Sequence, residues 1–485
     1  MNAGAVSVQC GGLLLAVALV LAGCATNPVT GEQDFVLMSE AEETKLGASY
    51  HQEILRQYRA YDDPELQAYV ERIGRNLATR SHRANLDFHF TVLDSAEINA
   101  FALPGGYIYV TRGILAYLNS EAELAGVIGH EIGHVTARHS VRQHSQSTVT
   151  GMLGGVLSAA TGAVTDNLFG ALGQALTRGY GRDHELEADR LGAQYLARAG
   201  YRPENMARVI GVLKDQEEFE TARAEREGRE PRAYHGVFAS HPRNDQRLKA
   251  TIHAAREYRS ENPLPDNRDA YLARIDGMLF GASPDHGVVR GQHFYDLERG
   301  FALTAPEGWR ISNFPRYVAF VPKSRDAFLQ LDAGGVQADG KPAGELLARL
   351  GTDSLDEGRS LQGDFPAYTG LGYAQTPYGA RTTRFVAWVV KDRVFMLAGA
   401  AKDPAEHDRY DQAFLSVANS FRNLSEAERG LARALRVVID PTPPGGYAAA
   451  ARNSPLDDAT AQLRLLNGDY PDGEAHSGRR IKVVR

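Results

Sequence analysis

One stretch decides the fold of this chain: residues 124–134, which read LAGVIGHEIGH. His130 and His134 are four residues apart, so on a helix they lie one turn apart on the same face, and their imidazoles can converge on one ion. Glu131 lies at the edge of that face, where its carboxylate can reach a water on the metal without replacing a ligand. This is the arrangement of the H-E-x-x-H zinc-protease motif.

The start of this helix is also visible in the sequence. Ser120, followed three residues later by Glu123, makes a capping-box pattern ahead of the apolar run. Apolar residues dominate from Leu124 onward, which predicts a helix buried on nearly all sides. We therefore expect the two histidines to lie inside a folded domain.

A catalytic zinc site needs a third protein ligand. The metzincin pattern would place a histidine six residues after His134 and a glycine three residues after it, but those positions hold Ser140 and Ala137. That subclass is therefore excluded. His139 misses the register of His130 and His134 by one position, so the helical projection points it well away from their face, and we predict a structural or surface role for it.

A better third ligand lies in residues 180–189, which read YGRDHELEAD. Glu185 and Asp189 are again four residues apart, on a predicted second helix, whereas Glu187 should face the other way. Glu185 can bind the metal while Asp189 holds the free ring nitrogen of a histidine ligand. Two histidines and one glutamate leave a position open for water, which is typical of a catalytic zinc. Taken alone, however, the segment is better explained as an ordinary charged helix face.

Three motifs follow one another along the chain: NAFALPGG at 99–106, ELAGVIGHEIGH at 123–134 and E-x-x-x-D at 185–189. Together they resemble the HtpX and CAAX prenyl endopeptidase family of zinc metalloproteases, and in particular its bacterial periplasmic branch. The resemblance covers about residues 27–256. It implies a gluzincin fold with one zinc ion and unfolded or misassembled envelope proteins as substrates, a role in protein quality control. It also implies a set of site residues: the ligands His130, His134 and Glu185, with Glu131 as general base.

Residues 238–242, FASHP, together with Arg247 match a further element of that family. Two interpretations of His241 stay open. It approaches the zinc as an inhibitory fourth ligand or stabilises the oxyanion, or it is a residue at a helix start before Pro242. His235 is a weaker candidate for the oxyanion role. A self-inhibited zinc site would fit a different class of function, a non-proteolytic envelope chaperone or scaffold.

The N-terminus predicts export. The first 23 residues carry no charge and include an apolar core at 13–21, as in an export signal. Residues 21–24, LAGC, resemble the lipobox of bacterial lipoproteins, in which Cys24 becomes the lipidated N-terminus, although the usual basic n-region is absent. An uncleaved membrane anchor is the alternative. Either way we expect a tethered periplasmic protein, and Ala25 after the cysteine favours the outer membrane.

Composition agrees with this prediction. Of the two cysteines, Cys10 would leave with the signal and Cys24 would carry lipid, so the mature chain would hold no disulfide and no thiolate zinc site. The formal net charge is −7, and the lack of a strong basic run argues against nucleic acid as the main partner. The remaining chain is long enough for two or three domains with full cores.

Local patterns place the motifs in a mainly α, zincin-type domain with a small sheet. Capping residues Ser39 and Asp63 predict two helices, and residues 88–93 and 107–111 predict strands. If the second strand borders the cleft, an extended substrate can add to its free edge. Residues 142–178, rich in Gly, Ala, Ser and Thr, are predicted to be a flexible helical cover beside the active site.

Breaks in these patterns divide the chain. An α+β accessory domain with a hairpin about residues 391–393 is loosely similar to the PsbP and Mog-one sandwich, and no catalytic constellation occurs in it, so we expect a docking role. A small C-terminal module resembles LysM, which implies contact with peptidoglycan. The predicted segments are 1–23 (signal peptide), 24–38 (tether), 39–256 (zinc metallopeptidase domain), 257–290 (linker), 291–425 (accessory domain) and 430–485 (C-terminal module).

Overall fold

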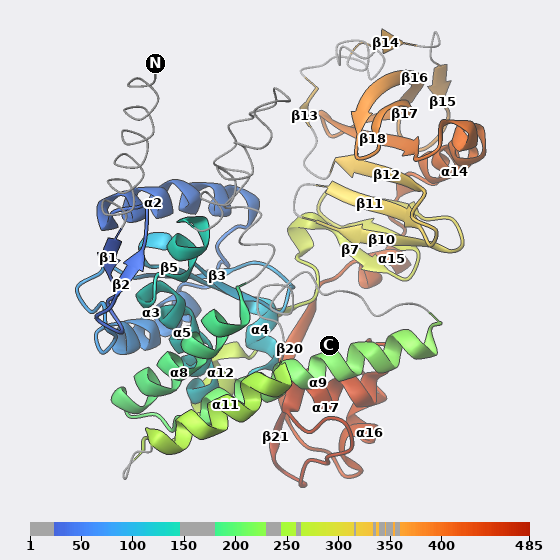
Figure 1. Cartoon of the computed structure of the whole chain (residues 1–485). Helices are drawn as coiled ribbons and strands as arrows, with labels where there is room; N and C mark the ends of the chain where they lie inside the picture. Colours follow the sequence, from blue (N-terminus) through green and yellow to red (C-terminus); the bar gives the residue numbers. More distant parts are fainter. Residues whose placement is uncertain are drawn as a thin grey trace, which may run out of the picture. The chain divides into compact units, whose positions relative to one another are not determined.

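The computed structural model divides the chain into two compact units: unit 1, residues 1–278 with 436–485, and unit 2, residues 279–435 (Figure 1). The predicted signal peptide, His235, His241 and nearly all of the predicted helical cover lie outside the described residues. Within the described residues, no helix combines the length and apolar character needed to cross a membrane. The structure describes residues 24–145, 180–228, 244–258, 263–314, 317–332, 336–338, 345, 353–354 and 359–485.

Unit 1 is mainly helical, as predicted, and two of its helices begin at the expected residues. The Ser39 side chain accepts a hydrogen bond from the Glu42 amide while the Glu42 carboxylate accepts one from the Ser39 amide, which completes a capping box. The Asp63 side chain accepts from the Leu66 amide, and Pro64 occupies the first turn. The helices are α2 (Glu40–Gln57), α3 (Pro64–Ala78), α4 (Arg112–Tyr117), α5 (Glu121–Thr136), α8 (Arg182–Arg198), α9 (Glu204–Arg226), α11 (Asn244–Glu257) and α12 (Arg268–Ile275).

The sheet of unit 1 differs from the prediction in one respect. Its strand order is β3-β5-β4, with β5 parallel to β3 and antiparallel to β4. The expected free edge on β5 is therefore wrong, because β5 has a partner on both sides. Within the described residues, β4 is the outer strand that contacts α5. The strands of unit 1 are β1 (Cys24–Thr26), β2 (Gln33–Phe35), β3 (His89–Leu93), β4 (Ala100–Leu103) and β5 (Tyr107–Thr111), with the 3-10 turn η1 (Pro104–Gly106) before β5.

Helix α5 is buried along its whole length, as the apolar run predicts. The Ser120 hydroxyl accepts a hydrogen bond of 3.2 Å from the Glu123 amide, so Ser120 caps the helix. The Glu123 carboxylate bonds to the amide of Asn119 at 2.6 Å, one residue before the cap. Helices α3, α8 and α9 pack around α5 and keep it inside unit 1.

Glycines allow α5 and α8 to approach closely. A Cβ atom at Gly133 would lie 2.9 Å from the carbonyl oxygen of Ala188 and 3.1 Å from its Cα. A Cβ atom at Gly129 would lie 3.5 Å from the Cα of Gly192. Because these α5 positions carry no side chain, the two backbones can come into contact. This contact sets the distance between the two helices, and so the distance from Glu185 and Asp189 of α8 to the histidines of α5.

Two segments outside the predicted peptidase domain also belong to unit 1. Inside the predicted linker, Tyr271 of α12 is buried and donates to the Leu115 carbonyl at 2.6 Å. Near the C-terminus, the buried ammonium of Lys482 donates to the carbonyls of Ala116 at 2.8 Å and Leu118 at 2.7 Å. The likeness to LysM stays a prediction. The C-terminal elements are β20 (Leu435–Pro441), α16 (Gly446–Ala451), α17 (Ala459–Asn467) and β21 (Arg480–Val484), and β20 and β21 pair antiparallel.

Unit 2 is dominated by antiparallel sheet, in agreement with the α+β prediction (Figure 1). Its larger sheet has the order β10-β11-β12-β18-β17-β16-β14, with β13 beside β18 and β15 beside β16. Strands β17 and β18 form the predicted hairpin, whose turn residues Lys391 and Asp392 have φ of 47° and 61°. From α14, Phe414 and Val417 join the core cluster that contains Phe395.

The elements of unit 2 are short strands with few helices, and a second sheet has the order β19-β9-β8-β7. The elements are β6 (Leu279–Phe280), η2 (Pro284–His286), β7 (Val288–Arg290), β8 (His293–Asp296), β9 (Phe301–Thr304), β10 (Trp309–Asn313), β11 (Tyr317–Pro322), β12 (Ala327–Asp332), β13 (Val336–Gln337), β14 (Asp353–Ser354), β15 (Arg359–Leu361), β16 (Ala367–Thr376), β17 (Gly379–Val390), β18 (Arg393–Ala401), η3 (Pro404–Glu406), α14 (His407–Asn419), β19 (Arg422–Asn423) and α15 (Glu426–Leu431).

The substitution Gly133→Ala tests the α5–α8 contact. We expect it to lower the stability of the protein by about 1–3 kcal/mol, because the new methyl group would push against the α8 backbone. The matched control is Gly211→Ala in α9, where a Cβ atom would meet nothing within 4 Å. That change should raise stability by about 0.5–1 kcal/mol, since alanine is the better helix former. Urea denaturation of both variants measures the difference, and equal shifts would contradict this packing.

Candidate metal centre

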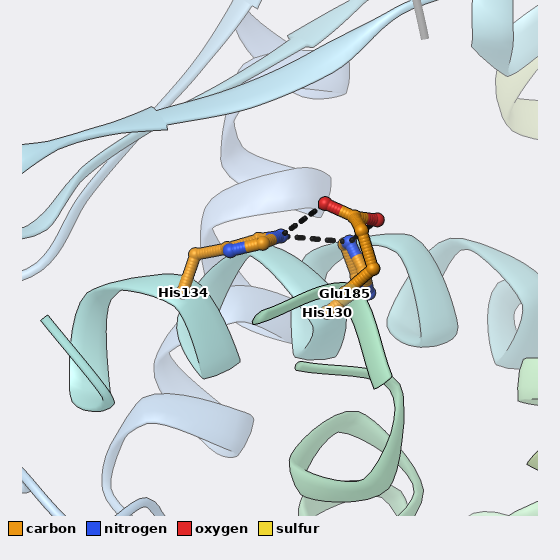
Figure 2. A group of neighbouring side chains, drawn as sticks. All are labelled: His130, His134 and Glu185. Atoms are coloured by element: carbon orange, nitrogen blue, oxygen red, sulfur yellow. Dashed lines mark hydrogen bonds and ion pairs between the residues drawn. The ribbon is translucent and has the colours of Figure 1, made fainter. Parts of the chain in front are cut away.

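The two histidines of the H-E-x-x-H motif converge as the sequence predicts (Figure 2). His130 and His134 lie one turn apart on α5, and their side chains are 5% and 1% exposed. Their Nε2 atoms are 3.0 Å apart and point to the same place. Both imidazoles therefore offer a lone pair to one ion.

Glu185 reaches the same place from α8 (Figure 2). Its carboxylate oxygens lie 3.6 Å from Nε2 of His130 and 3.5 Å from Nε2 of His134, and the side chain is fully buried. Within the described residues, these three side chains are the group of histidine, cysteine and acidic residues whose ligand atoms could hold a metal ion. Ligands at 2.0–2.1 Å from a tetrahedral zinc lie roughly 3.3 Å apart. The donor set and its spacing therefore fit zinc.

Asp189 and Arg247 lie directly behind this group. Oδ1 of Asp189 is 2.9 Å from Nδ1 of His130, the contact that the i, i+4 spacing from Glu185 suggests. Arg247 from α11 donates two hydrogen bonds to Asp189, of 2.7 and 2.8 Å, and its Nη1 is 3.1 Å from Glu185. Burial by itself would raise the pKa of Asp189, but the charge and hydrogen bonds of Arg247, with the contact to His130, hold that pKa far below its usual value. Asp189 is therefore a carboxylate that can orient His130.

Arg247 is a site residue whose role the sequence did not reveal. It lies in the segment that resembles a family element, but nothing in its spacing indicates that it would bridge Glu185 and Asp189. Burial would lower the pKa of Arg247, yet Asp189 and Glu185 raise it above the ordinary value, so the guanidinium stays charged. A buried positive charge is what two buried carboxylates require.

His139 and Glu187 contradict their predicted positions. His139 is fully buried, and its Nδ1 lies 2.7 Å from Nδ1 of His134. The helical projection fails because α5 ends at Thr136 and Arg138 turns the backbone with a φ of 54°, so His139 is not on the same helix. Glu187 does not face away from this region, since its Oε2 is 3.1 Å from Nε2 of His139.

Glu131 follows His130 on α5 and is 2% exposed. It lines a small pocket of about 20 Å³, together with His130 and Arg247. The rest of the lining is apolar and comes from β4, α4, α5 and α9: Ala100, Ile114, Val127, Met206, Val209 and Leu213. Glu131 and the predicted ligand His130 therefore line the same small, mostly apolar pocket.

A buried helix with H-E-x-x-H and a second helix that brings a glutamate to the two histidines are the features of an H-E-x-x-H metallopeptidase centre. The comparison with protein families agrees, because residues 64–255 match Peptidase family M48. The chain thus carries an M48 peptidase domain, and the M48 metallopeptidases are zinc-dependent. This confirms the family resemblance and the predicted class of enzyme.

The chain is similar to several curated proteins over part of its length. The chain is 28% identical over 261 residues to the beta-barrel assembly-enhancing protease of Escherichia coli K12, covering 51% of each protein. It is 29% identical over 269 residues to the protein of that name from Yersinia pestis, covering 53% of this chain and 52% of the relative. It is also 35% identical over 142 residues to the mitochondrial metalloendopeptidase OMA1 of Arabidopsis thaliana, covering 29% of each.

The chain spans about half the length of these beta-barrel assembly-enhancing proteases. Among solved structures, it is similar to the cyanobacterial PsbP of Synechocystis, with 17% identity over 28% of this chain and 98% of that one. The TM-score is 0.22, too low to support an argument about function.

Removal of the Glu185 carboxylate tests the metal centre. We expect Glu185→Ala to lose bound zinc, because the remaining pair of histidines cannot hold it in competition with water and chelators. The control is Asp183→Ala, which removes an exposed carboxylate from the same helix and should leave zinc content unchanged. Zinc is measured by elemental analysis after dialysis, and full occupancy in Glu185→Ala would rule out Glu185 as a ligand.

Proposed function

We propose that this chain is a zinc-dependent endopeptidase of the bacterial cell envelope that cleaves unfolded or misassembled envelope proteins. One observation carries the proposal: His130, His134 and Glu185 form a buried group that could hold a metal ion, and His130 lines a mostly apolar pocket together with Glu131. The match to Peptidase family M48 and to envelope proteases supports it.

The residues have separate roles in the proposed reaction. When bound by His130, His134 and Glu185, zinc supplies Lewis-acid activation of a water and of the scissile carbonyl. Glu131 takes the proton of the attacking water and then returns it to the leaving amine. Asp189 keeps the proton of His130 on Nδ1, so that Nε2 stays available as a ligand.

The proposed substrate binds in an extended form along β4. This strand is the outer strand of its sheet within the described residues, and its Ala100 lines the cavity. Pairing with a strand edge uses the backbone of the substrate, so it tolerates many sequences. The cavity then takes one apolar side chain. Unfolded proteins expose both features, whereas folded proteins bury their apolar side chains.

We also propose that the enzyme is tethered to the cell envelope. Lipid on Cys24, in the sequence LAGC, would hold the enzyme at the periplasmic face of the membrane, with the outer membrane favoured by Ala25. A LysM-like segment at 430–485 would add contact with peptidoglycan. Metabolic labelling with a fatty acid tests the lipid, and a Cys24→Ser variant that is still labelled would contradict this part of the proposal.

Glu131→Gln separates catalysis from metal binding. We expect the variant to keep zinc and fold, because the amide has the same shape as the carboxylate, but to lose at least about 100-fold in the cleavage of casein, since the amide cannot accept the proton. The measurement uses the soluble chain that begins after Cys24, with Asp183→Ala as the active control. A Glu131→Gln variant with substantial activity would refute the role of Glu131 as base.

Leu213→Ala tests the cavity as the site of side-chain selection. The smaller residue enlarges the cavity, so we expect cleavage to shift by about 10-fold toward peptides with larger apolar or aromatic residues next to the scissile bond. Lys214→Ala, the next residue on α9, is the control and should leave the profile unchanged. Cleavage sites in a peptide library are mapped by mass spectrometry, and an unaltered profile in Leu213→Ala would exclude the cavity from substrate selection.

A further inference from the structure

The two histidines of the metal centre are supported in different ways. His130 contacts the Asp189 carboxylate directly, at 2.9 Å from its Nδ1. His134 contacts another histidine instead: its Nδ1 lies 2.7 Å from Nδ1 of His139. The opposite nitrogen of His139, Nε2, lies 3.1 Å from Oε2 of Glu187. Each histidine is thus linked to a carboxylate. Asp189 contacts His130 directly, whereas Glu187 is linked to His134 through His139.

Only one placement of the ring protons on His134 and His139 satisfies these contacts and leaves Nε2 of His134 free to bind a metal. Nε2 of His134 faces Nε2 of His130 and the Glu185 carboxylate, so its lone pair must be free for the metal and the proton must sit on Nδ1. That proton is donated to Nδ1 of His139, which accepts it as a neutral imidazole. His139 then carries its own proton on Nε2 and donates it to Glu187.

Glu187, the last residue in this series of contacts, is held in place by an ion pair. Arg142 lies 3.2 Å from the same Glu187 oxygen and 3.4 Å from Asp34, so Glu187 has a cationic partner. His139 is held on one ring face by His184, with centroids 4.3 Å apart and an 18° angle between the rings.

We propose that His139 and Glu187 are positioning residues, which hold His134 in the tautomer and orientation that present Nε2 to the metal. The inference rests on the proposed zinc site and deepens it. Two independent features of the fold build this arrangement. The left-handed turn at Arg138 brings His139 back against His134, and α8 supplies Glu187 two residues after the ligand Glu185.

Zinc affinity, measured by competition with a chelator, tests this proposal. Partners of this kind contribute about 10–100-fold to metal affinity, so we expect His139→Leu to bind zinc at least about 10-fold more weakly. His139→Asn should recover most of that loss, because its Oδ1 can take the place of Nδ1 and accept the proton of His134. The control His144→Leu removes a histidine from the same segment and should bind zinc like the wild type.

A double-mutant cycle separates positioning from packing. Glu187→Gln should weaken zinc binding in the wild type but cause no further loss in His139→Leu, since its effect passes through His139. Nitrogen NMR of the metal-free wild type gives a readout that needs no mutation, and it should show the proton of His134 on Nδ1. The unfolding temperature of each metal-free variant checks the fold.

The outcomes distinguish this proposal from the proposed function. If the wild type binds no zinc, the metal centre itself is wrong and the inference falls with it. If the wild type binds zinc and His139→Leu binds it equally well, only the positioning role is overturned. Equal weakening by His139→Leu and His139→Asn would also overturn it, because that result indicates packing. If His139→Leu does not fold, the test rests on the tautomer of His134 measured by NMR and on the zinc affinity of Glu187→Gln. A proton on Nε2 of His134 would contradict the proposal.

Discussion

The charge balance of a buried cluster is the constraint on which unit 1 depends. Glu185 and Asp189 are 0% and 1% exposed, and Glu131 is 2% exposed, so three acidic side chains lie inside the domain. A carboxylate without a partner costs several kcal/mol in such a place. Arg247 offsets one charge through Asp189 and Glu185. A divalent cation between His130, His134 and Glu185 would balance the remainder, which gives the site a physical reason to bind metal.

The packing of two helices decides whether that cluster can form. Glu185 and Asp189 can approach the histidines because Gly133 leaves room for the α8 backbone at Ala188 to lie close to α5. The same approach carries Glu187 to His139. One helix contact therefore positions the proposed third ligand and the carboxylates behind both histidines, so the candidate metal centre and the core of unit 1 are parts of one packing arrangement.

The surroundings of the centre suit a protease with broad selectivity. His130 and Glu131 line a small, mostly apolar pocket, and strand β4 contributes Ala100 to its wall. The proposed backbone pairing and single apolar contact would demand little of a substrate sequence. The substrate that we propose is therefore an extended chain with exposed apolar side chains, as in an unfolded protein.

Local patterns in the sequence determined much of this protein. The i, i+4 spacing of His130 and His134, the caps at Ser39, Asp63 and Ser120 and the hairpin of β17 and β18 depend on neighbouring residues, and the structure confirms their positions. The spacing of Glu185 and Asp189 also indicated the correct second helix. These predictions succeeded because helix geometry relates residues a few positions apart.

Only the tertiary structure decided the features that depend on residues far apart. The position of β5 between two strands follows from sheet order, and the buried Lys482 finds its carbonyl partners 366 and 364 residues away. Arg247 meets Asp189 across 58 residues. His139 was misplaced for a local reason, because one left-handed residue at Arg138 ends the helical register. Periodicity describes a regular helix, but it carries no information about where a helix stops or what packs against it.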